Sequence, residues 1–242
     1  MENVNNYLEL IQAPWGRMFY ELLFHQLDLP QTPRLKILDF GSGLGVTASH
    51  FAAWHDVTAV DPDAEMIKHR RKENIYTQIH GTVESLAAFQ ANTFDAVLCH
   101  NVLDYVEDKE PIVAELFRVL KPGGPLSIIK HNRAGKVFQT AVFQNDPQKA
   151  LSLLDSRVYD KSNYLGTQYI YTNDDVAVWA AKYGGKIRNI LGMRTFWALG
   201  QDNAVKYTDG WYQNMLALEM RAAELNAYRQ VAMFNHLLIS KK

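Results

Sequence analysis

The feature that most constrains the fold is a short apolar run that leads straight into a glycine-rich turn. Residues 35–40 are followed by Gly41, Gly43 and Gly45. This pattern predicts a buried strand passing into a helix, because glycines permit positive φ and let the backbone approach a ligand closely. The free N–H groups at the start of that helix then offer donors to a nucleotide-like ligand. A tight strand-to-helix turn without a ligand is the alternative explanation.

An acidic residue follows where nucleotide-binding folds hold a ribose. Residues 56–61 form a second apolar run that ends at Asp61, roughly 20 residues beyond the glycines, and a carboxylate there suits a ribose diol. Asp61 can instead cap a helix that begins at Pro62, with Asp63 and Glu65 favouring the positive end of that helix. The two roles are compatible.

The glycine turn departs from the dinucleotide-binding fingerprint at one position. That fingerprint has Gly or Ala where this chain has Val46, and a bulkier residue fits a ligand without a pyrophosphate. With Asp39 before the glycines, Asp-Pro-Asp at 61–63, Met66 behind it and Leu-Lys-Pro-Gly-Gly at 120–124, the chain resembles the class I S-adenosylmethionine-dependent methyltransferases. The resemblance implies S-adenosyl-L-methionine as the cofactor.

Further segments narrow the resemblance to the bacterial SmtA/CmoM-like group, which includes tRNA carboxymethoxyuridine methyltransferases. The segments that carry this likeness are residues 100–106, 127–132 and 192–196 and the acidic helix near Glu219. The likeness covers nearly the whole chain and is weakest in the middle. It implies tRNA as the partner, with a small-molecule acceptor as the alternative within the same enzyme class.

The alternation of apolar runs predicts an α/β fold with a mainly parallel sheet and helices on both faces. Strands are expected at 35–40, 56–61, 75–80, 94–99 and 125–131, and helices at 44–54, 62–73 and 109–120. We expect a single methyltransferase domain over 1–242. Its parts are a helical cover at 1–34, a cofactor-binding core at 35–131, a polar substrate-side insertion at 132–172 that crosses the cleft, and a sheet-closing part at 173–242.

The C-terminal part is expected to complete the sheet. Asn173 and Asp174 can cap a helix over 176–183, which Gly184 and Gly185 end. A strand over 186–196, a long helix near 211–226 and a strand near 230–239 follow. The resemblance implies seven strands in a Rossmann-like sheet, closed by an antiparallel strand.

The composition indicates a cytoplasmic enzyme. Cys99 is the only cysteine of the 242 residues, so no internal disulfide forms, and we expect this residue to pack in a strand. The N-terminus lacks a signal-peptide pattern, and no apolar run reaches the roughly 20 residues of a membrane span. No metal site is expected.

A net charge of −1 provides no overall basic field, so tRNA would have to meet a local patch. The candidate residues for such a patch are Lys121, Lys130, Arg133, Lys136 and Lys161. A scatter of charges like this one is usually a solvated face.

The resemblance assigns the cofactor contacts. Arg17 matches an arginine that holds the cofactor carboxylate, although it is equally explained as a solvated helix residue. A backbone N–H at Val83 and the side chain of Glu84 would recognise adenine, although Glu84 also suits a helix start. The full expected set is Arg17, Asp39, Gly41, Ser42, Gly43, Gly45, Asp61, Pro62, Met66, Val83, Glu84 and His100.

Methyl transfer is an in-line displacement at a carbon activated by the positive sulfur, so positioning and desolvation carry most of the acceleration. A carboxylate acceptor is already ionised at neutral pH and needs no base. An amine or hydroxyl acceptor would need one, and His100, Asp104 and His131 are the candidates. His100 is also explained as a satisfied imidazole at a strand end.

Arg194 is the leading candidate for acceptor recognition, because a guanidinium can orient a carboxylate by two parallel hydrogen bonds. A structural pair with Asp202 is the alternative. Tyr105 and Asn132 complete the expected acceptor-side set. Four aromatic residues, Trp197, Tyr207, Trp211 and Tyr212, lie where a base could stack, although core packing explains most of them.

Two other function classes fit part of the pattern. A non-catalytic module that senses S-adenosylmethionine would keep the ribose and adenine contacts but lose the acceptor pocket. A nicotinamide oxidoreductase is disfavoured by Val46 and by the missing second nucleotide half.

Overall fold

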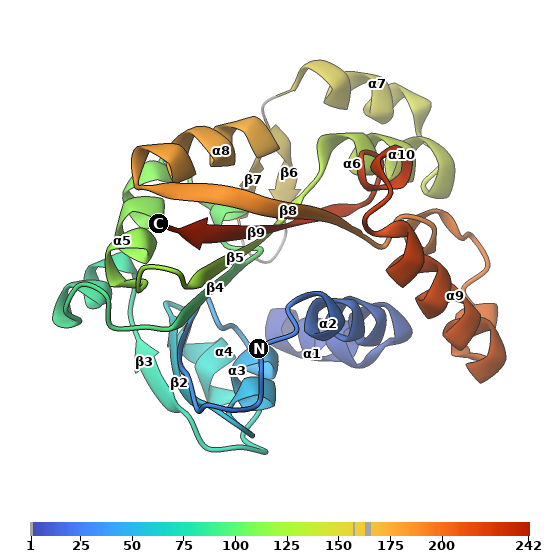
Figure 1. The fold of residues 1–242 in the computed structure, drawn as a ribbon. Helices are drawn as coiled ribbons and strands as arrows, with labels where there is room; N and C mark the ends of the chain where they lie inside the picture. The colour runs from blue at the N-terminus through green and yellow to red at the C-terminus, as the bar shows by residue number, and fades with distance from the viewer. Residues whose placement is uncertain (1, 157, 163–165) are drawn as a thin grey trace.

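The computed structural model describes residues 2–156, 158–162 and 166–242. A seven-stranded sheet runs through the centre of the molecule, with helices on both sides (Figure 1). Its strand order is β3-β2-β1-β4-β5-β9-β8. The strands are β1 (Lys36–Phe40), β2 (Asp56–Asp61), β3 (Thr77–His80), β4 (Ala96–His100), β5 (Pro125–His131), β8 (Gly185–Met193) and β9 (Phe234–Lys241).

The predicted fold class is confirmed. Strands β1 to β5 are parallel to one another, and β9 is antiparallel to both β5 and β8. The central strands read as continuous apolar runs because both faces of the sheet are covered. Ile37 and Leu38 on β1, for example, point to opposite faces, and neither side chain is exposed.

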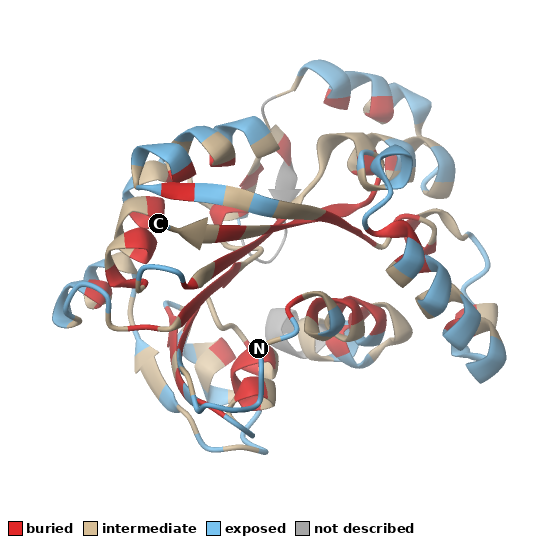
Figure 2. Cartoon of the chain, viewed as in Figure 1, coloured by how far each residue is buried: buried red, intermediate tan, exposed pale blue. Residues whose placement is uncertain are grey.

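Two apolar layers hold helices against the sheet, and Figure 2 shows the central strands mostly buried and the outer helix faces exposed. On one face pack α5 (Glu110–Val119), α8 (Asn173–Lys182) and the 3₁₀ helix η1 (Val83–Ala88). On the other face pack α2 (Pro14–Gln26), α3 (Val46–Phe51) and α9 (Asp209–Ala222). These two hydrophobic layers hold the ends of the strands in place.

The N-terminal cover consists of two helices, α1 (Glu2–Gln12) and α2, which meet at Ala13. Pro14 stands at the first position of α2, where its missing N–H costs no helical hydrogen bond. Gly16 allows the close corner, because a Cβ there would lie 2.3 Å from the carbonyl oxygen of Ile11.

Two predicted helices were too long, since the structure has α3 over Val46–Phe51 and α4 only over Ala64–Lys68. The chain leaves α4 early and returns to the glycine turn, where the N–H of Arg71 donates to the carbonyl of Leu44 at 2.8 Å. The cap of α4 is Asp63, which accepts from the N–H groups of Glu65 and Met66. The alternative that made Asp61 the cap is therefore wrong.

The cap predicted for α8 was also wrong. Thr172 caps this helix and forms a capping box with Asp175, while Asn173 is already the first helical residue. The segment predicted as a polar insertion is built from short elements: α6 (Arg133–Phe138), a π-turn η3 (Gln139–Phe143), α7 (Pro147–Asp155), β6 (Val158–Ser162) and β7 (Gly166–Tyr169). The remaining elements are η2 (Leu103–Tyr105), η4 (Trp197–Leu199), η5 (Val205–Tyr207) and α10 (Asn226–Arg229).

Leu116 on α5 tests the α5 layer. Its side chain is fully buried among the strands and α8, so Leu116→Ala removes apolar contacts and leaves a cavity, and we expect a loss of about 2–5 kcal/mol in the free energy of unfolding. Leu151→Ala on α7, where the leucine is 67% exposed, should change it by less than about 0.5 kcal/mol. Urea denaturation measures both, and equal losses would contradict the packing described.

Candidate cofactor and acceptor site

A cavity of about 510 Å³ lies at the carboxyl ends of β1, β2, β4 and β5, under the N-terminal helices. This is the edge at which open parallel sheets bind ligands. Ten of the predicted site residues line it: Asp39, Gly41, Ser42, Gly43, Asp61, Pro62, Met66, His100, Tyr105 and His131. The structure therefore brings most of the expected cofactor set, and part of the acceptor set, into one space.

The glycine turn is held to β2 by the acid predicted to bind a ribose. Asp61 Oδ2 accepts from the N–H of Gly43 at 2.6 Å, and Oδ1 accepts from the N–H of Asp63 at 2.9 Å. Each oxygen keeps a further lone pair that can accept from a hydroxyl. Gly41 has φ +79°, and a Cβ there would lie 2.1 Å from a methyl of Val102, so the turn requires glycine at this point.

Asp39 is buried beneath this turn, with one carboxylate oxygen lacking a hydrogen-bond partner among the described residues. Burial, and then the charge of Asp61, raise the pKa of Asp39 to about 7, against an opposing hydrogen bond from the N–H of Ala48. Burial likewise raises the pKa of Asp61. The cavity floor thus carries two carboxyl groups that a cationic ligand would favour in their ionised forms.

The end of β4 adds further acceptors. Asn101 Oδ1 and Asp104 Oδ2 are both buried and without a hydrogen-bond partner among the described residues. Asn101 also takes a left-handed φ of +56°, a strained conformation of the kind that clusters at functional sites. Buried acceptors without donors are uncommon, and together they match a ligand that carries N–H donors and positive charge.

The hairpin of β6 and β7 lies against Tyr105 and His131 of the cavity lining. Gln168 Nε2 donates to the Tyr105 hydroxyl at 3.1 Å and lies 3.1 Å from Nδ1 of His131. Asp104 Oδ1 accepts from the N–H of His131 at 3.2 Å and lies 3.4 Å from its Nδ1. This hairpin belongs to the segment predicted as a substrate-side insertion, and it contacts two residues of the cavity lining. No motif pointed to Gln168, because only the folding of the hairpin brings it to Tyr105 and His131.

Arg194 lies behind the wall of the cavity. Its guanidinium is 5.1 Å from the ring of Trp15 and 5.7 Å from that of Phe234, and both rings line the cavity. Its Nε is buried and without a partner among the described residues. Burial lowers the pKa of Arg194 to about 10, partly offset by the charge of Glu219.

Neither nearby acid forms a direct ion pair with Arg194 in the described structure. The Glu219 carboxylate accepts from the N–H groups of Thr195, Phe196 and Trp197, each at 2.8 Å. Asp202, the pairing partner that the sequence offered as an alternative, accepts from the N–H of Ala204 instead. The guanidinium is thus held by aromatic faces more than by a carboxylate.

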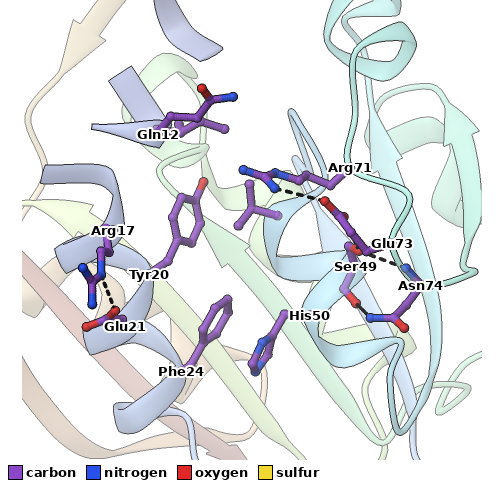
Figure 3. Close-up of a pocket in the computed structure, with 12 residues that line it drawn as sticks. Gln12, Arg17, Tyr20, Glu21, Phe24, Ser49, His50, Arg71, Glu73 and Asn74 are labelled. Carbon is purple, nitrogen blue, oxygen red and sulfur yellow. Dashed lines mark hydrogen bonds and ion pairs between the residues drawn. The ribbon is translucent and has the colours of Figure 1, made fainter. Parts of the chain in front are cut away.

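Arg17 does not line this cavity. It borders a second, open cavity of about 550 Å³ between the N-terminal helices and α3, shown in Figure 3. There its Nε donates to Glu21 at 2.8 Å, one turn along α2, and its guanidinium lies 4.2 Å from the ring of Tyr212. A contact with the cofactor carboxylate would require this pair to open, so that role stays a prediction.

Four other predicted residues also lie off the cavity lining. Glu84 is exposed and accepts from the hydroxyl of Thr82, and Val83 packs against the core. Asn132 donates its side-chain amide to the carbonyls of Gln230 and Ala232. Gly45 faces Tyr76, whose hydroxyl would lie 2.1 Å from a Cβ there. The geometry gives Asn132 and Gly45 structural reasons for their identity.

The proposed basic strip does not form a continuous surface patch. Lys130 is buried, donates to the carbonyl of His131 at 2.8 Å and lies over the ring of Tyr171. Lys121 pairs with Asp95, and Arg133 donates to the carbonyls of Leu154 and Ser156. The side chain of Lys161 lies outside the described residues. Of the C-terminal aromatics, Trp197 and Tyr212 pack in the core, whereas Tyr207 is 71% exposed.

Sequence reasoning missed the apolar wall that the N-terminal helices contribute. Tyr7, Ile11, Trp15 and Phe19 all line the cavity. Within each helix the spacing of four residues was the available signal, because Tyr7 and Ile11 share one face of α1, and Trp15 and Phe19 share one face of α2. The corner between the two helices brings both faces to the cavity, and no local spacing predicts that corner.

Comparison with known proteins indicates the class of enzyme to which this chain is similar. Residues 38–128 match the family described as "Methyltransferase domain". The chain is 26% identical over 241 residues to the tRNA 5-carboxymethoxyuridine methyltransferase of Escherichia coli K12, covering 93% of this chain and 89% of the relative. It is 33% identical over 138 residues to the ubiquinone biosynthesis O-methyltransferase of Psychrobacter cryohalolentis, covering 54% of this chain and 53% of the relative.

The fold is shared with solved S-adenosylmethionine-dependent methyltransferases. One from Thermotoga maritima superposes with a TM-score of 0.65 at 18% identity, covering 100% of this chain and 97% of the other. One from Mesorhizobium loti gives 0.61 at 16% identity, covering 89% and 95%. The matched domain, the relatives and the fold make this chain an S-adenosylmethionine-dependent methyltransferase. Its similarity over most of its length is to the tRNA 5-carboxymethoxyuridine methyltransferases.

Two features are absent from residues 2–156, 158–162 and 166–242. No helix in these ranges is long and apolar enough to cross a bilayer. No group of three or more His, Cys, Asp or Glu side chains in these ranges is arranged to hold a metal ion.

Asp39 provides a pH-dependent prediction. Its pKa is about 7 in the folded protein and 3.8 ordinarily, so the folded state binds its proton more tightly than the unfolded chain does. The free energy of unfolding should therefore fall as the pH rises from about 4 to about 7 and then level off. Asp39→Asn removes this dependence, and relative to wild type the variant should be more stable at pH 8 than at pH 4, by a few kcal/mol in order of magnitude.

Thermal denaturation across this pH range measures the effect, with Asp28→Asn at an exposed carboxylate as the control. At pH 8, Asp39→Asn should also bind S-adenosylhomocysteine roughly tenfold or more weakly, because a charged acceptor is lost. If Asp39→Asn gained no stability at pH 8 and bound S-adenosylhomocysteine normally, the claim that burying ionised Asp39 costs stability would be contradicted.

Proposed function

We propose that this enzyme transfers the methyl group of S-adenosylmethionine to a carboxylate, and that the carboxylate belongs to a modified wobble uridine in tRNA. The observation that carries the proposal is Arg194, a buried guanidinium behind two rings of the cavity wall with an unpartnered Nε. A guanidinium is suited to orienting a planar carboxylate. Trp15 and Phe234 offer flat faces for a base beside it.

The cofactor fits the cavity by charge and by shape. Asp61 would accept from the ribose hydroxyls, while Gly41 and Gly43 let the backbone approach the ligand. The unpartnered oxygens of Asp39 and Asn101 would accept hydrogen bonds from the protonated amino group of the cofactor. The bound cofactor supplies a methyl group made electrophilic by its positive sulfur. These acceptors would hold the positively charged amino group and so orient the cofactor before the transfer.

The chain's own residues would then orient the acceptor. Arg194 would hold one carboxylate oxygen so that the other attacks the methyl carbon opposite the sulfur, and the C–S electron pair leaves with the sulfur as a neutral thioether. The carboxylate is ionised at neutral pH, so no residue needs to remove a proton. The hairpin residue Gln168 and the wall residue Tyr105 would exclude water from this end.

The tRNA acceptor is supported by the relative named as a tRNA 5-carboxymethoxyuridine methyltransferase, since that similarity covers 93% of this chain and so extends beyond the cofactor-binding core. The likeness to ubiquinone biosynthesis O-methyltransferases is higher in identity but spans about half of this chain. An enzyme of this function would act in the cytoplasm.

A hydroxyl on a small molecule is the second candidate acceptor. The contact of 3.4 Å between Asp104 and Nδ1 of His131 favours it, because a carboxylate beside an imidazole can support proton removal. Loss of methyl transfer in His131→Gln without loss of cofactor binding would point to this acceptor.

The test is transfer of radiolabelled methyl groups to total tRNA and to a small-molecule extract, each from cells lacking this enzyme. We expect label in tRNA that is released as methanol by mild alkali, as a methyl ester requires. Label confined to the small-molecule fraction would overturn the tRNA proposal, and alkali-stable label would overturn the carboxylate.

Arg194→Lys should lower kcat/KM for the labelled acceptor by about tenfold or more, because lysine keeps the charge but loses the paired donors. Its affinity for S-adenosylhomocysteine should be unchanged. Arg188→Lys is the matched control, since Arg188 lies on the same strand, is exposed and donates to Ser240. Equal activity of the two variants would remove Arg194 from acceptor recognition.

A further inference from the structure

A chain of buried hydrogen bonds connects the cavity to helix α2 through side chains that the proposed reaction does not use. His100 Nε2 lies 2.8 Å from Ser127 Oγ, which lies 2.7 Å from His236 Nε2. His236 Nδ1 lies 2.9 Å from Oε1 of Gln26 on α2. Ser127 and His236 are fully buried. Ser127 lies on β5, which neighbours β4 in the sheet, and His236 lies on β9, which neighbours β5 (Figure 1).

The far end of this chain fixes its direction. Gln26 Nε2 donates to the carbonyl of Gly192 at 3.0 Å. Turning the amide over would place its oxygen against that carbonyl, two acceptors facing each other. Gln26 therefore presents its oxygen to His236, and His236 must carry its proton on Nδ1.

The remaining protons follow in order. His236 is fully buried and burial lowers its pKa to about 3, so it is neutral and its Nε2 is a bare acceptor. The hydroxyl of Ser127 donates to that Nε2, and its oxygen accepts from His100. His100 is then protonated on Nε2 and unprotonated on Nδ1.

This assignment leaves Nδ1 of His100 as an acceptor that can take a hydrogen bond from a ligand in the cavity. His100 lines the cavity, and its Nδ1 is buried and has no partner among the described residues. A bare buried acceptor costs free energy until a donor reaches it. Burial and the neighbouring His236 hold the pKa of His100 well below its usual range, so it is neutral near pH 7.

We propose that Gln26, His236 and Ser127 form a relay that holds His100 in the tautomer with Nδ1 unprotonated, so that this nitrogen accepts a hydrogen bond from the cofactor's amino group. Its neighbour in this role is Asp39, the unpartnered acceptor at the end of the adjacent strand β1. Gln26, His236 and Ser127 are positioning residues, since they act only through His100. The inference rests on the proposed placement of the cofactor.

The relay also bears on the acid–base alternatives. A His100 with a bare Nδ1 repels a carboxylate oxygen brought against it, because both are acceptors. A carboxylate acceptor would therefore bind on the Tyr105 and Arg194 side, away from this nitrogen. His100 is thus assigned to the cofactor and leaves His131 as the imidazole at the acceptor end.

The test is nitrogen-15 NMR of the intact protein labelled at histidine, with His100 assigned from His100→Gln. We expect the Nδ1 of His100 to show the shift of an unprotonated ring nitrogen and Nε2 that of a protonated one. Saturating S-adenosylhomocysteine, which carries the same amino group, should move the Nδ1 signal upfield as it accepts a hydrogen bond. A protonated Nδ1 in the free protein would overturn the proposal.

Gln26→Met keeps the length of the side chain but removes its acceptor, so it should give a mixture of His100 tautomers and about fivefold weaker binding of S-adenosylhomocysteine. Gln31→Met, at an exposed glutamine outside the relay, should change neither. Ser127→Ala breaks the same chain one step nearer to His100 and provides an independent variant if Gln26→Met does not fold.

The outcomes separate this inference from the proposed function. Calorimetry that detects S-adenosylhomocysteine binding, together with an Nδ1 signal that does not move, overturns the relay and leaves the proposed function in place. An unchanged tautomer in both relay variants also overturns it. Absence of any binding to the wild-type protein overturns both.

Discussion

The structure depends on an electrostatic imbalance at the ends of β1 and β2. Asp39 and Asp61 are buried beside each other, burial raises the pKa of both, and no Lys or Arg pairs with either among the described residues. A chain selected for stability alone would replace or pair such groups. A cationic ligand would favour the ionised forms of both carboxyl groups and so offset the cost of burying them. Asp61 offsets part of its own cost by holding the glycine turn through Gly43.

The hydrophobic layers make this arrangement possible, because they fix the strand ends before any ligand arrives. Side chains such as Leu38 and Leu98 are wholly buried in the two apolar layers, one on each face of the sheet. The polar groups at the carboxyl ends of these strands can therefore stay unsatisfied without the sheet rearranging. The core preorganises the site in this way: the free energy of packing offsets the cost of burying hydrogen-bond acceptors that have no partner.

The sequence predicted the parts of the fold that local pattern determines. Apolar runs gave the strands, and glycines with an acid beyond them gave Gly41, Gly43 and Asp61, all of which line the cavity. It failed where distant contacts decide. Helix α4 ends early because the returning chain bonds to the glycine turn, and Gln168 meets the lining residues Tyr105 and His131 through a hairpin. No local spacing encodes these two contacts. The spacing of four between Arg17 and Glu21, by contrast, was a local signal for their ion pair and was overlooked.

Helix α2 contacts both the cavity wall near Arg194 and the hydrogen-bond chain that leads to His100. Trp15 and Phe19 line the cavity, and Arg194 lies behind the ring of Trp15. Gln26, at the other end of the helix, orients the proposed relay that ends at His100. Displacing α2 from the sheet would move Trp15 and Phe19 out of the cavity lining. It would also break the hydrogen bond between Gln26 and His236, on which the proposed tautomer of His100 depends. Its buried face, with Met18, Leu22 and Leu23 fully enclosed, makes that displacement costly. If the proposed cofactor and acceptor contacts hold, the packing of this one helix would couple cofactor recognition to acceptor recognition.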